Sequence, residues 1–286
     1  MIILDERQYA YRCLEENDIG SNPYVTLTII AKYYYHYCGY KKQKIKDLLI
    51  DFLNRSYTSY HTEKNTWNKY IETIVSKVNK QILYQISGVK ITKSEIVTIQ
   101  NIHNKLLEKL MFTMLCLAKF YNLKRKNNNS WVNTSAKEIF ELAGISTTIE
   151  KRDIKIGELW DLGLIEFSKR NDNLNCRVSF INDDEDEELF VSDFRTLGNE
   201  YLLYCGENYI RCAECGLLIK NTVNSHSMYC KNCIANGYPH IKKKVCVDCG
   251  INFTASTLSR RIRCENCYKI ERQRIERDKK RKQRCK

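Results

Sequence analysis

Eight of the fourteen cysteines recur at a fixed offset, and this repeat constrains the fold more than any other feature of the sequence. Two CxxC pairs are separated by fourteen residues, and the same arrangement starts again 34 residues later. The first set is Cys212, Cys215, Cys230 and Cys233, and the second is Cys246, Cys249, Cys264 and Cys267. Such a regular repeat marks an internal duplication in which each period is one structural unit.

The spacing of these cysteines fits the coordination chemistry of zinc. Zn²⁺ prefers four soft donors at the corners of a tetrahedron, and a CxxC turn presents two thiolates to one ion. Gly216 and Gly250 directly follow the leading pairs, where the turn needs backbone angles that favour glycine. The sequence therefore predicts two structural Zn²⁺ ions, each bound by four cysteines in a zinc ribbon, over residues 205–236 and 237–268.

Two other interpretations of the cysteines are weaker. Thioredoxin-like CxxC pairs need a βαβ context and do not come in spaced couples. A catalytic zinc ion keeps one coordination position open, whereas four thiolates close the site. His226 and His240 lie in or beside the ribbons, and we expect both to be surface residues because four cysteines already complete each site.

The formal charge of +13 is concentrated near the C-terminus. Residues 205–286 carry 19 Lys/Arg against 7 Asp/Glu, whereas residues 1–204 carry 28 against 27. An excess of this size on a small module indicates a polyanion, and we expect nucleic acid as the partner. Residues 269–286 are predicted to be a basic tail, either a helix or a disordered arm that lies along phosphates. The alternative is a solvated tail that serves solubility.

The order of predicted elements over residues 93–182 is typical of a winged helix-turn-helix. The elements are an apolar helix at 106–118, a short helix opened by a Ser135-x-x-Glu138 capping box and ended by Gly144, a longer helix opened by Thr147-x-x-Glu150 and ended by Gly163, and strands at 164–167 and 176–181 around a turn at 171–173.

The segment from Leu159 to Ile165, LWDLGLI, resembles the junction at which winged-helix proteins pass from the recognition helix to the wing. The resemblance implies that the helix from Thr147 to Leu162 would enter a major groove with its N-terminal end first. Its apolar side is expected to hold Ile154, Leu159 and Leu162. The alternative is a winged helix that mediates only protein contacts.

The cations expected to contact nucleic acid lie on this helix, on the wing, in the second ribbon and in the tail. They are Lys151, Arg152, Lys155, Lys169, Arg170, Lys242, Lys243, Lys244, Arg260, Arg261, Arg263, Arg272, Arg274, Arg277, Lys279, Lys280, Arg281 and Lys282.

The remaining segments are predicted to be mainly helical. Residues 1–92 are expected to form a helical N-terminal domain, and residues 183–204 an acidic linker followed by a short helix. We expect the six acids of 183–188 to lie in an exposed loop, because their charges repel one another. The fold class is therefore mainly α with small β elements (α+β). The N-terminal elements are helices at 24–38, 42–53 and 67–78, a hairpin at 83–91, and a helix opened by a Thr92-x-x-Glu95 capping box.

Several function classes lack support in the sequence. No stretch approaches the roughly 20 apolar residues that span a membrane, and acids follow Met1 too closely for a secretory signal, so a cytoplasmic location is expected. There is no phosphate-binding GxxxxGK[ST] loop, no HExxH and no GxSxG. The sequence therefore favours a binding protein over an enzyme.

The chain as a whole resembles a family of phage and prophage proteins. The resemblance rests on helices at 24–80 like those found beside primases, on the Ser130–Asn133 segment SWVN, and on the C-terminal CxxCG ribbons. It implies a bacterial host cell and a role in DNA replication or transcriptional control, with DNA favoured over RNA. Two alternatives remain: an adaptor recruited to a polymerase or replisome protein, and a nuclease or primase accessory whose active site no motif reveals.

Overall fold

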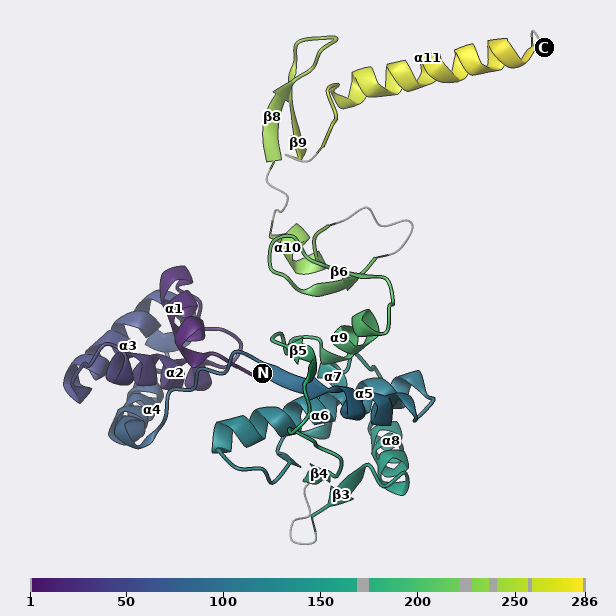
Figure 1. The fold of residues 1–286 in the computed structure, drawn as a ribbon. Coiled ribbons are helices and arrows are strands. Elements are labelled where there is room, and N and C mark those ends of the chain that lie inside the picture. The colour runs from purple at the N-terminus through teal and green to yellow at the C-terminus, as the bar shows by residue number, and fades with distance from the viewer. Residues whose placement is uncertain (1, 169–174, 222–227, 237–240, 257–258, 285–286) are drawn as a thin grey trace. The chain divides into compact units, whose positions relative to one another are not determined.

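The computed structural model describes residues 2–168, 175–221, 228–236, 241–256 and 259–284 (Figure 1). The chain divides into two compact units, Met1–Tyr204 and Cys205–Lys286. The described residues are mainly helical and form four small antiparallel sheets, which confirms the expected α+β class. Within this described part, no helix combines the length and the apolar character that crossing a bilayer requires.

The first four helices of the first unit surround a continuous apolar core. They are α1 (Glu6–Glu16), α2 (Pro23–His36), α3 (Lys42–Ser56) and α4 (Lys64–Lys77), with 3-10 turns at Thr58–His61 and Val78–Lys80. Ile45, Leu49, Phe52 and Leu53 of α3 are fully buried, because residues at this spacing share one face of a helix. The helices predicted at 24–38, 42–53 and 67–78 are confirmed, and α1 is an additional helix that the sequence did not predict.

The hairpin predicted at 83–91 is wrong. Instead β1 (Val89–Thr92) pairs antiparallel with β5 (Glu187–Val191), a strand from the far side of the acidic run. Val89 lies opposite Val191, and Gly88 precedes this contact at a point where a side chain has no room. A Cβ atom on Gly88 would stand 2.5 Å from the Val191 carbonyl oxygen. The segment predicted to be a hairpin therefore leads into one strand, β1, whose partner strand lies about a hundred residues later in the chain.

Five of the six acids at 183–188 are exposed and residues 183–186 form a loop as predicted, but two of the carboxylates accept hydrogen bonds from specific donors. Its first residue, Asp183, accepts a bond from the Lys119 ammonium at 2.8 Å, and Lys119 also pairs at 2.8 Å with Glu95, whose side chain is fully buried. The Glu185 carboxylate accepts from the Ser94 backbone N–H at 3.1 Å. Glu187 and the acid after it begin β5. Specific donors thus offset the repulsion that led to the prediction of an irregular loop.

The remaining part of the first unit is built around a long buried helix, α6. Its elements are α5 (Lys93–Gln100), α6 (Lys105–Arg125), β2 (Trp131–Val132), α7 (Ala136–Leu142), α8 (Ile149–Asp161), β3 (Ile165–Phe167), β4 (Cys176–Val178) and α9 (Leu197–Tyr204). Strands β2, β3 and β4 form one antiparallel sheet with β4 in the centre. The predicted strands 164–167 and 176–181 are thus present in shortened form, and β2 is a third strand that the sequence did not predict. The turn expected at 171–173 lies outside the described residues.

The capping boxes locate the helix starts closely but not always to the residue. Thr92 and Glu95 form the expected reciprocal box at the start of α5. Ser135 Oγ accepts from the Glu138 backbone N–H at 3.3 Å at the start of α7. For α8 the N-cap is Thr148 and not Thr147, so the predicted start is wrong by one residue.

The predicted apolar side of α8 needs a larger correction. Leu159 is buried as expected, but its buried companion is Ile156, whereas Ile154 is 59% and Leu162 54% exposed. For Ile154 the reason is geometric: residues five positions apart differ by about 140° around a helix, so Ile154 cannot share the face of Leu159. Leu162 is the C-cap residue and lies beyond the last residue of α8. The exposed apolar residues of α8 therefore point away from the core of the first unit.

The second unit contains two successive modules of the same design. The first consists of β6 (Tyr209–Arg211), β7 (Leu218–Lys220) and α10 (Lys231–Ala235), and the second of β8 (Ile241–Val245), β9 (Asn252–Ser256) and α11 (Glu265–Arg284). In each module an antiparallel hairpin comes before a helix that starts directly after the third cysteine of the set.

Candidate metal centres and the basic surface of the second unit

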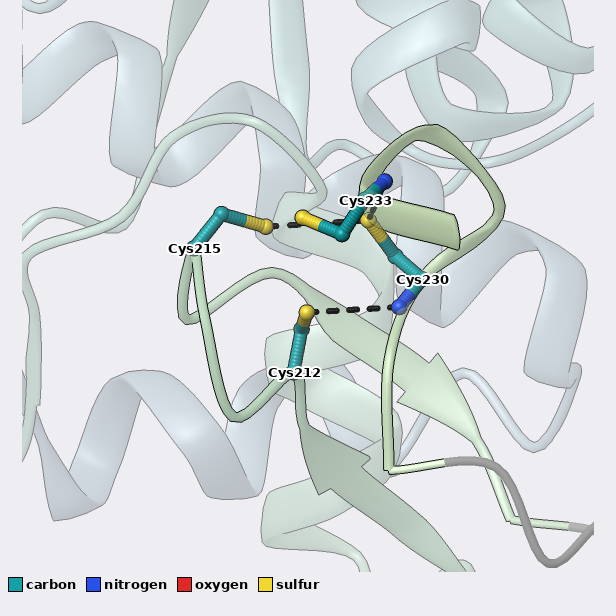
Figure 2. A group of neighbouring side chains, drawn as sticks. All are labelled: Cys212, Cys215, Cys230 and Cys233. Carbon is teal, nitrogen blue, oxygen red and sulfur yellow. Dashed lines mark hydrogen bonds between the residues drawn. The ribbon is translucent and has the colours of Figure 1, made fainter. Parts of the chain in front are cut away.

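The first cysteine set forms a cluster at the end of the β6–β7 hairpin. The sulfur atoms of Cys212, Cys215, Cys230 and Cys233 all lie within 4.8 Å of one another and converge on one point (Figure 2). Cys212 follows β6, Cys215 closes the turn, and the other two flank and enter α10. The Cys230 backbone N–H donates to the Cys212 sulfur at 3.2 Å, which links the two halves of the cluster.

The second set repeats this geometry, and its four sulfur atoms also lie within 4.8 Å of one another. Its members are Cys246, Cys249, Cys264 and Cys267. The backbone bonds that shape the CxxC turns recur at the offset of 34. Gly216 N–H donates to Cys212 O, and Gly250 N–H donates to Cys246 O, both at 2.9 Å. Both glycines have positive φ angles, 72° and 70°. The duplication seen in the sequence is therefore a duplication of backbone structure.

The distances between sulfur atoms fit a tetrahedral metal ion. Cys215 Sγ lies 3.7 Å from Cys230 Sγ, and the equivalent pair, Cys249 and Cys264, is also separated by 3.7 Å. A tetrahedron with metal–sulfur bonds of about 2.3 Å has edges of about 3.8 Å. One sulfur pair in each cluster thus already has the separation that a tetrahedral ion requires, and the eight cysteines chosen from their spacing are the ones brought together.

In each cluster, the surroundings of one cysteine lower the pKa of its thiol. Burial acts to raise the pKa of Cys212, but backbone N–H groups, chiefly those of Cys215 and Cys230, outweigh it and lower the pKa to about 6. The backbone N–H of Cys264 is the largest of the causes that lower the pKa of Cys246 to about 6. Because metal ligation requires deprotonated sulfur, these two residues offer the first ligand at neutral pH, and binding would release the protons of the others.

The two modules differ in how much apolar packing supports them. The first has a small core in which Leu217, Ile219 and Tyr229 pack against the cysteines. In the second, Val247 is 61% and Ile251 63% exposed. Because fewer of its described residues are buried, the stability of this module rests more on its cysteine cluster, which a bound metal ion would stabilise. The second module therefore depends on its cluster more than the first does.

The expected basic tail is the continuation of the second module's helix. Residue 265, at which α11 starts, is the counterpart of Lys231, the first residue of α10, and Cys267 lies in the first turn of α11. Of the two alternatives, a helix or a disordered arm, the structure shows a helix that continues to Arg284. The metal cluster and the tail thus belong to one element.

The predicted cations of the second module differ in their surroundings. Lys243 and Arg260 are exposed. The Lys244 ammonium is half-buried and donates to the backbone carbonyls of residues 259 and 261, so it positions a loop. Arg263 pairs with Asp248 at 2.7 Å.

The described cations of α11 are exposed to solvent. Arg272 and Arg274 make only surface ion pairs, with Glu276 at 3.6 Å and with Glu271 at 3.1 Å. The other exposed members are Arg277, Lys279 and Lys280. The side chains of Lys242, Arg281 and Lys282, and the residues Lys169, Arg170, His226 and His240 as a whole, lie outside the described part of the structure.

The cations predicted on α8 do not form a basic surface. Lys151 is exposed, but Lys155 pairs with Glu158 at 2.6 Å. Arg152 was expected to be exposed, yet its guanidinium turns toward its own fold, donating to the Thr147 carbonyl at 3.3 Å. The structure thus gathers the predicted cations in the second unit and not on this helix.

Sequence reasoning missed Tyr268 and Lys269, which line a cleft beside the second cluster, and Phe253, which lines an adjoining hollow. The offset of 34 could have identified two of them. Tyr268 and Lys269 stand where the first module has Ile234 and Ala235, so the duplicated modules differ there in charge and aromatic character.

Two closed four-cysteine clusters, a basic cleft and a basic helix define the chemistry of the second unit. Comparison of the chain with models of known protein families, with curated proteins and with solved structures found no match.

Proposed function

We propose that the second unit is a nucleic-acid-binding module whose fold depends on two structural zinc ions. Four thiolates form a soft, tetrahedral donor set of the kind that selects zinc. Cys212, Cys215, Cys230 and Cys233 would hold one ion, and Cys246, Cys249, Cys264 and Cys267 the other. Four protein ligands leave no position for a substrate, so the ions would stabilise the two zinc ribbons and take no part in catalysis.

The observation that carries the nucleic-acid proposal is the set of exposed cations on the second ribbon and on α11. The second unit has 19 Lys/Arg against 7 Asp/Glu, and two zinc ions with eight thiolates would leave a charge of about +8. Ile270 and Ile275 of α11 are 64% and 46% exposed and form no broad apolar stripe. A helix that is basic without an apolar face suits a phosphate backbone better than a lipid surface.

For the first unit, the order of elements supports a winged helix-turn-helix. A long helix, a strand, two helices and a two-stranded hairpin follow one another from α6 to β4, and β2 pairs with β4, the last strand. In this interpretation α8 is the recognition helix, and α7 and α8 form the helix-turn-helix. A setting in phage replication or gene control is proposed from the resemblance of the sequence alone.

A second candidate function, protein recruitment, is favoured by the exposed side of α8. Ile149 is 69% and Trp160 52% exposed, these two residues lie within about 20° of each other around the helix, and the Trp160 ring lies 6.1 Å from that of Phe167. Exposed apolar and aromatic residues on one small element are typical of protein contacts. We therefore propose that the first unit docks on a protein of the replication or transcription machinery while the second unit binds nucleic acid.

A titration by fluorescence anisotropy tests the main proposal. Zinc-loaded full-length protein and a chain that ends at Tyr204, the boundary between the units, would be titrated against labelled DNA at several salt concentrations. We expect the full chain to bind with a steep salt dependence and the shortened chain to lose most of the affinity. Cys176→Ser serves as a control, because Cys176 is a buried cysteine of the first unit that lies outside both clusters.

Other results would redirect the proposal. If the full chain binds neither duplex nor single-stranded DNA or RNA, the nucleic-acid function is wrong, and α8 should be used to search for protein partners. Cleavage of the labelled probe on addition of Mg²⁺ or Mn²⁺ would instead identify a nuclease, because closed zinc sites do not supply that chemistry.

A further inference from the structure

A cleft of about 660 Å³ opens beside the second four-cysteine cluster. Its walls come from the loop 259–263 and from the first turns of α11, and its apolar surfaces are Ile262 and Tyr268, each 52% exposed. A hollow on the side of the β8–β9 hairpin shares Arg261 and Glu265 with it. The size and the mixed lining are those of a ligand-binding pocket.

Cations dominate the polar lining of this cleft. They are Arg260, Arg261, Arg263, Lys269 and Arg272. The acid that lines it, Glu265, makes a solvent-exposed pair with Lys269 at 3.4 Å, and exposed pairs of this kind are weak. Among the described residues, no carboxylate pairs with Arg260 or Arg261. A concave surface with this excess of positive charge attracts phosphate.

The aromatic part of the cleft is held in place before any ligand arrives. The Arg261 guanidinium lies 5.6 Å from the centroid of the Tyr268 ring and 5.8 Å from that of Phe253. Arg261 Nε donates to the Arg263 carbonyl at 3.0 Å, and Lys244 donates to the Arg261 carbonyl at 3.4 Å. Because these contacts fix the loop and the rings, a ligand meets a surface that needs little further ordering.

The first ribbon serves as an internal comparison for these residues. It has the same backbone bonds in its CxxC turn and the same kind of cluster, but Ile234 replaces Tyr268 and Tyr229 replaces Arg263. The first ribbon also has Ala235 at the position equivalent to Lys269. The zinc-ribbon scaffold therefore does not require the aromatic and cationic side chains of the cleft, and a binding role accounts for them.

We infer that this cleft binds single-stranded nucleic acid, with one base stacked on Tyr268 and the adjoining phosphates paired with Arg260 and Arg261. An exposed tyrosine ring between cations can stack only on a base whose face is uncovered, whereas the base faces of a duplex are covered by their neighbours. The inference rests on the proposed function of the second unit, and it adds the class of strand and the residue that recognises it.

The test compares Tyr268→Leu with Tyr268→Phe in full-length, zinc-loaded protein. The probes are a fluorescein-labelled oligothymidylate of about 16 nucleotides and a DNA duplex of the same length. Wild type should prefer the oligothymidylate. Tyr268→Leu should weaken that binding by about 5-fold to about 100-fold, because it removes one stacked base, and should leave duplex binding nearly unchanged. Tyr268→Phe keeps the ring and should keep the affinity.

Two controls separate stacking from misfolding. Tyr11→Leu makes the same chemical change at a tyrosine of the first unit that is 57% exposed, and should change nothing. Tyr268→Trp places a reporter in the cleft, and its fluorescence, taken as the difference from wild type, should be quenched by oligothymidylate. Zinc content and far-UV circular dichroism would show that each variant is folded.

The possible outcomes separate failure of the proposed nucleic-acid binding from failure of the stacking assignment to Tyr268. If wild type binds neither probe, the proposed function fails, and this inference fails with it. If wild type binds oligothymidylate but Tyr268→Leu binds equally well and the Tyr268→Trp signal is unchanged, the module binds nucleic acid and the stacking assignment is wrong. If Tyr268→Leu loses zinc, the Tyr268→Trp fluorescence decides: quenching by oligothymidylate supports stacking, and an unchanged signal contradicts it. Equal affinity of wild type for the duplex would overturn the preference for a single strand.

Discussion

The cysteines of this protein show how the immediate surroundings determine what one residue type can do. Burial raises the pKa of Cys176 to about 12 and that of Cys116 well above its ordinary value, so both thiols stay protonated and act as small apolar side chains. In the clusters, backbone N–H groups lower the pKa of Cys212 and Cys246 to about 6. Spacing along the sequence separated the two kinds correctly, because a metal site fixes the spacing of its ligands and a core position does not.

We predict that Cys212→Ser lowers the zinc content from two ions per chain to one. The serine hydroxyl is a hard and weakly acidic donor, so the first site would lose both affinity and geometry, whereas the second cluster contains none of the same residues. Metal analysis of the purified protein measures the ratio. Cys205→Ser is the matched control, because Cys205 lies outside both clusters. Retention of two tightly bound ions by the Cys212 variant would contradict the assignment of four ligands to each ion.

A second prediction concerns Lys119, which is 4% exposed and holds the start of the acidic run. Replacing it with methionine leaves the fully buried Glu95 without its charged partner, which should reduce the free energy of unfolding by about 3–5 kcal/mol. Asp183→Asn removes the other partner of Lys119, but the Asp183 side chain is 52% exposed, so the loss should stay below about 1 kcal/mol. Urea denaturation measures both.

A double variant tests whether the unpaired Glu95 carboxylate causes the loss of stability. Adding Glu95→Gln to Lys119→Met should restore part of the stability, because a neutral amide costs less to bury than an unpaired carboxylate. Equal effects of Lys119→Met and Asp183→Asn would show that the buried Lys119–Glu95 pair contributes little.

At the scale of helices and strands, local signals predicted what local interactions determine. Capping boxes and apolar spacing located α2 to α5, α7 and α8 within a few residues. The β1–β5 ladder could not be predicted in this way, because its two strands lie about a hundred residues apart and one of them begins in a run of acids. The face of α8 was wrong for a different reason: Ile154 lies about 140° from Leu159 around the helix, whereas Ile156, three positions before Leu159, shares its face, so helix geometry alone favours Ile156.

The β1–β5 contact gives a third prediction, at Gly88. A Cβ atom there would lie 2.5 Å from the Val191 carbonyl oxygen and 2.7 Å from the Phe190 ring, so the strands would have to separate. Gly88→Ala should therefore destabilise the first unit by about 1–3 kcal/mol. The control is Gly157→Ala in the middle of α8, where nothing lies within 4 Å and alanine should stabilise by up to about 1 kcal/mol. Thermal unfolding would compare them, and an unchanged midpoint for Gly88→Ala would contradict the close contact.

The helix α11 gives a fourth prediction, because its first turn contains Cys267 of the second four-cysteine cluster. Most helical stability in proteins comes from packing of an apolar face, and Ile270 and Ile275 of α11 are 64% and 46% exposed. Its pairs Lys269–Glu265, Arg272–Glu276 and Arg274–Glu271 add only about 0.2–0.5 kcal/mol each. Removing the metal with a chelator should therefore unfold α11 together with the β8–β9 hairpin, with a clear loss of helical circular dichroism. A Cys264→Ser variant should show the same loss before chelation. Full helicity without metal would mean that α11 folds independently of the ribbon.

At the scale of the whole molecule, charge is divided unequally between the two units. The first unit is close to neutral, with 28 Lys/Arg against 27 Asp/Glu, and the second has an excess of twelve positive charges. This division could be predicted from sequence, because counting charges requires no fold. The cleft could not be predicted, because it forms only where residues 260–263 and the first turns of α11 come together. The excess of positive charge is thus concentrated in one of the two units.

The division of charge predicts where phosphate contacts are lost when cations are removed. Lys279 and Lys280 are exposed residues of α11, and each cation that neutralises a phosphate of a single strand contributes about 0.7 to the slope of log affinity against log salt concentration. Lys279→Gln/Lys280→Gln should therefore lower that slope by about 1.4, whereas Lys64→Gln/Lys69→Gln, which removes two exposed lysines of the first unit, should leave it unchanged. Salt titrations with the same oligothymidylate measure both. Equal losses from the two pairs would mean that the first unit also lies along the nucleic acid, and no loss from either would place the phosphate contacts in the cleft alone.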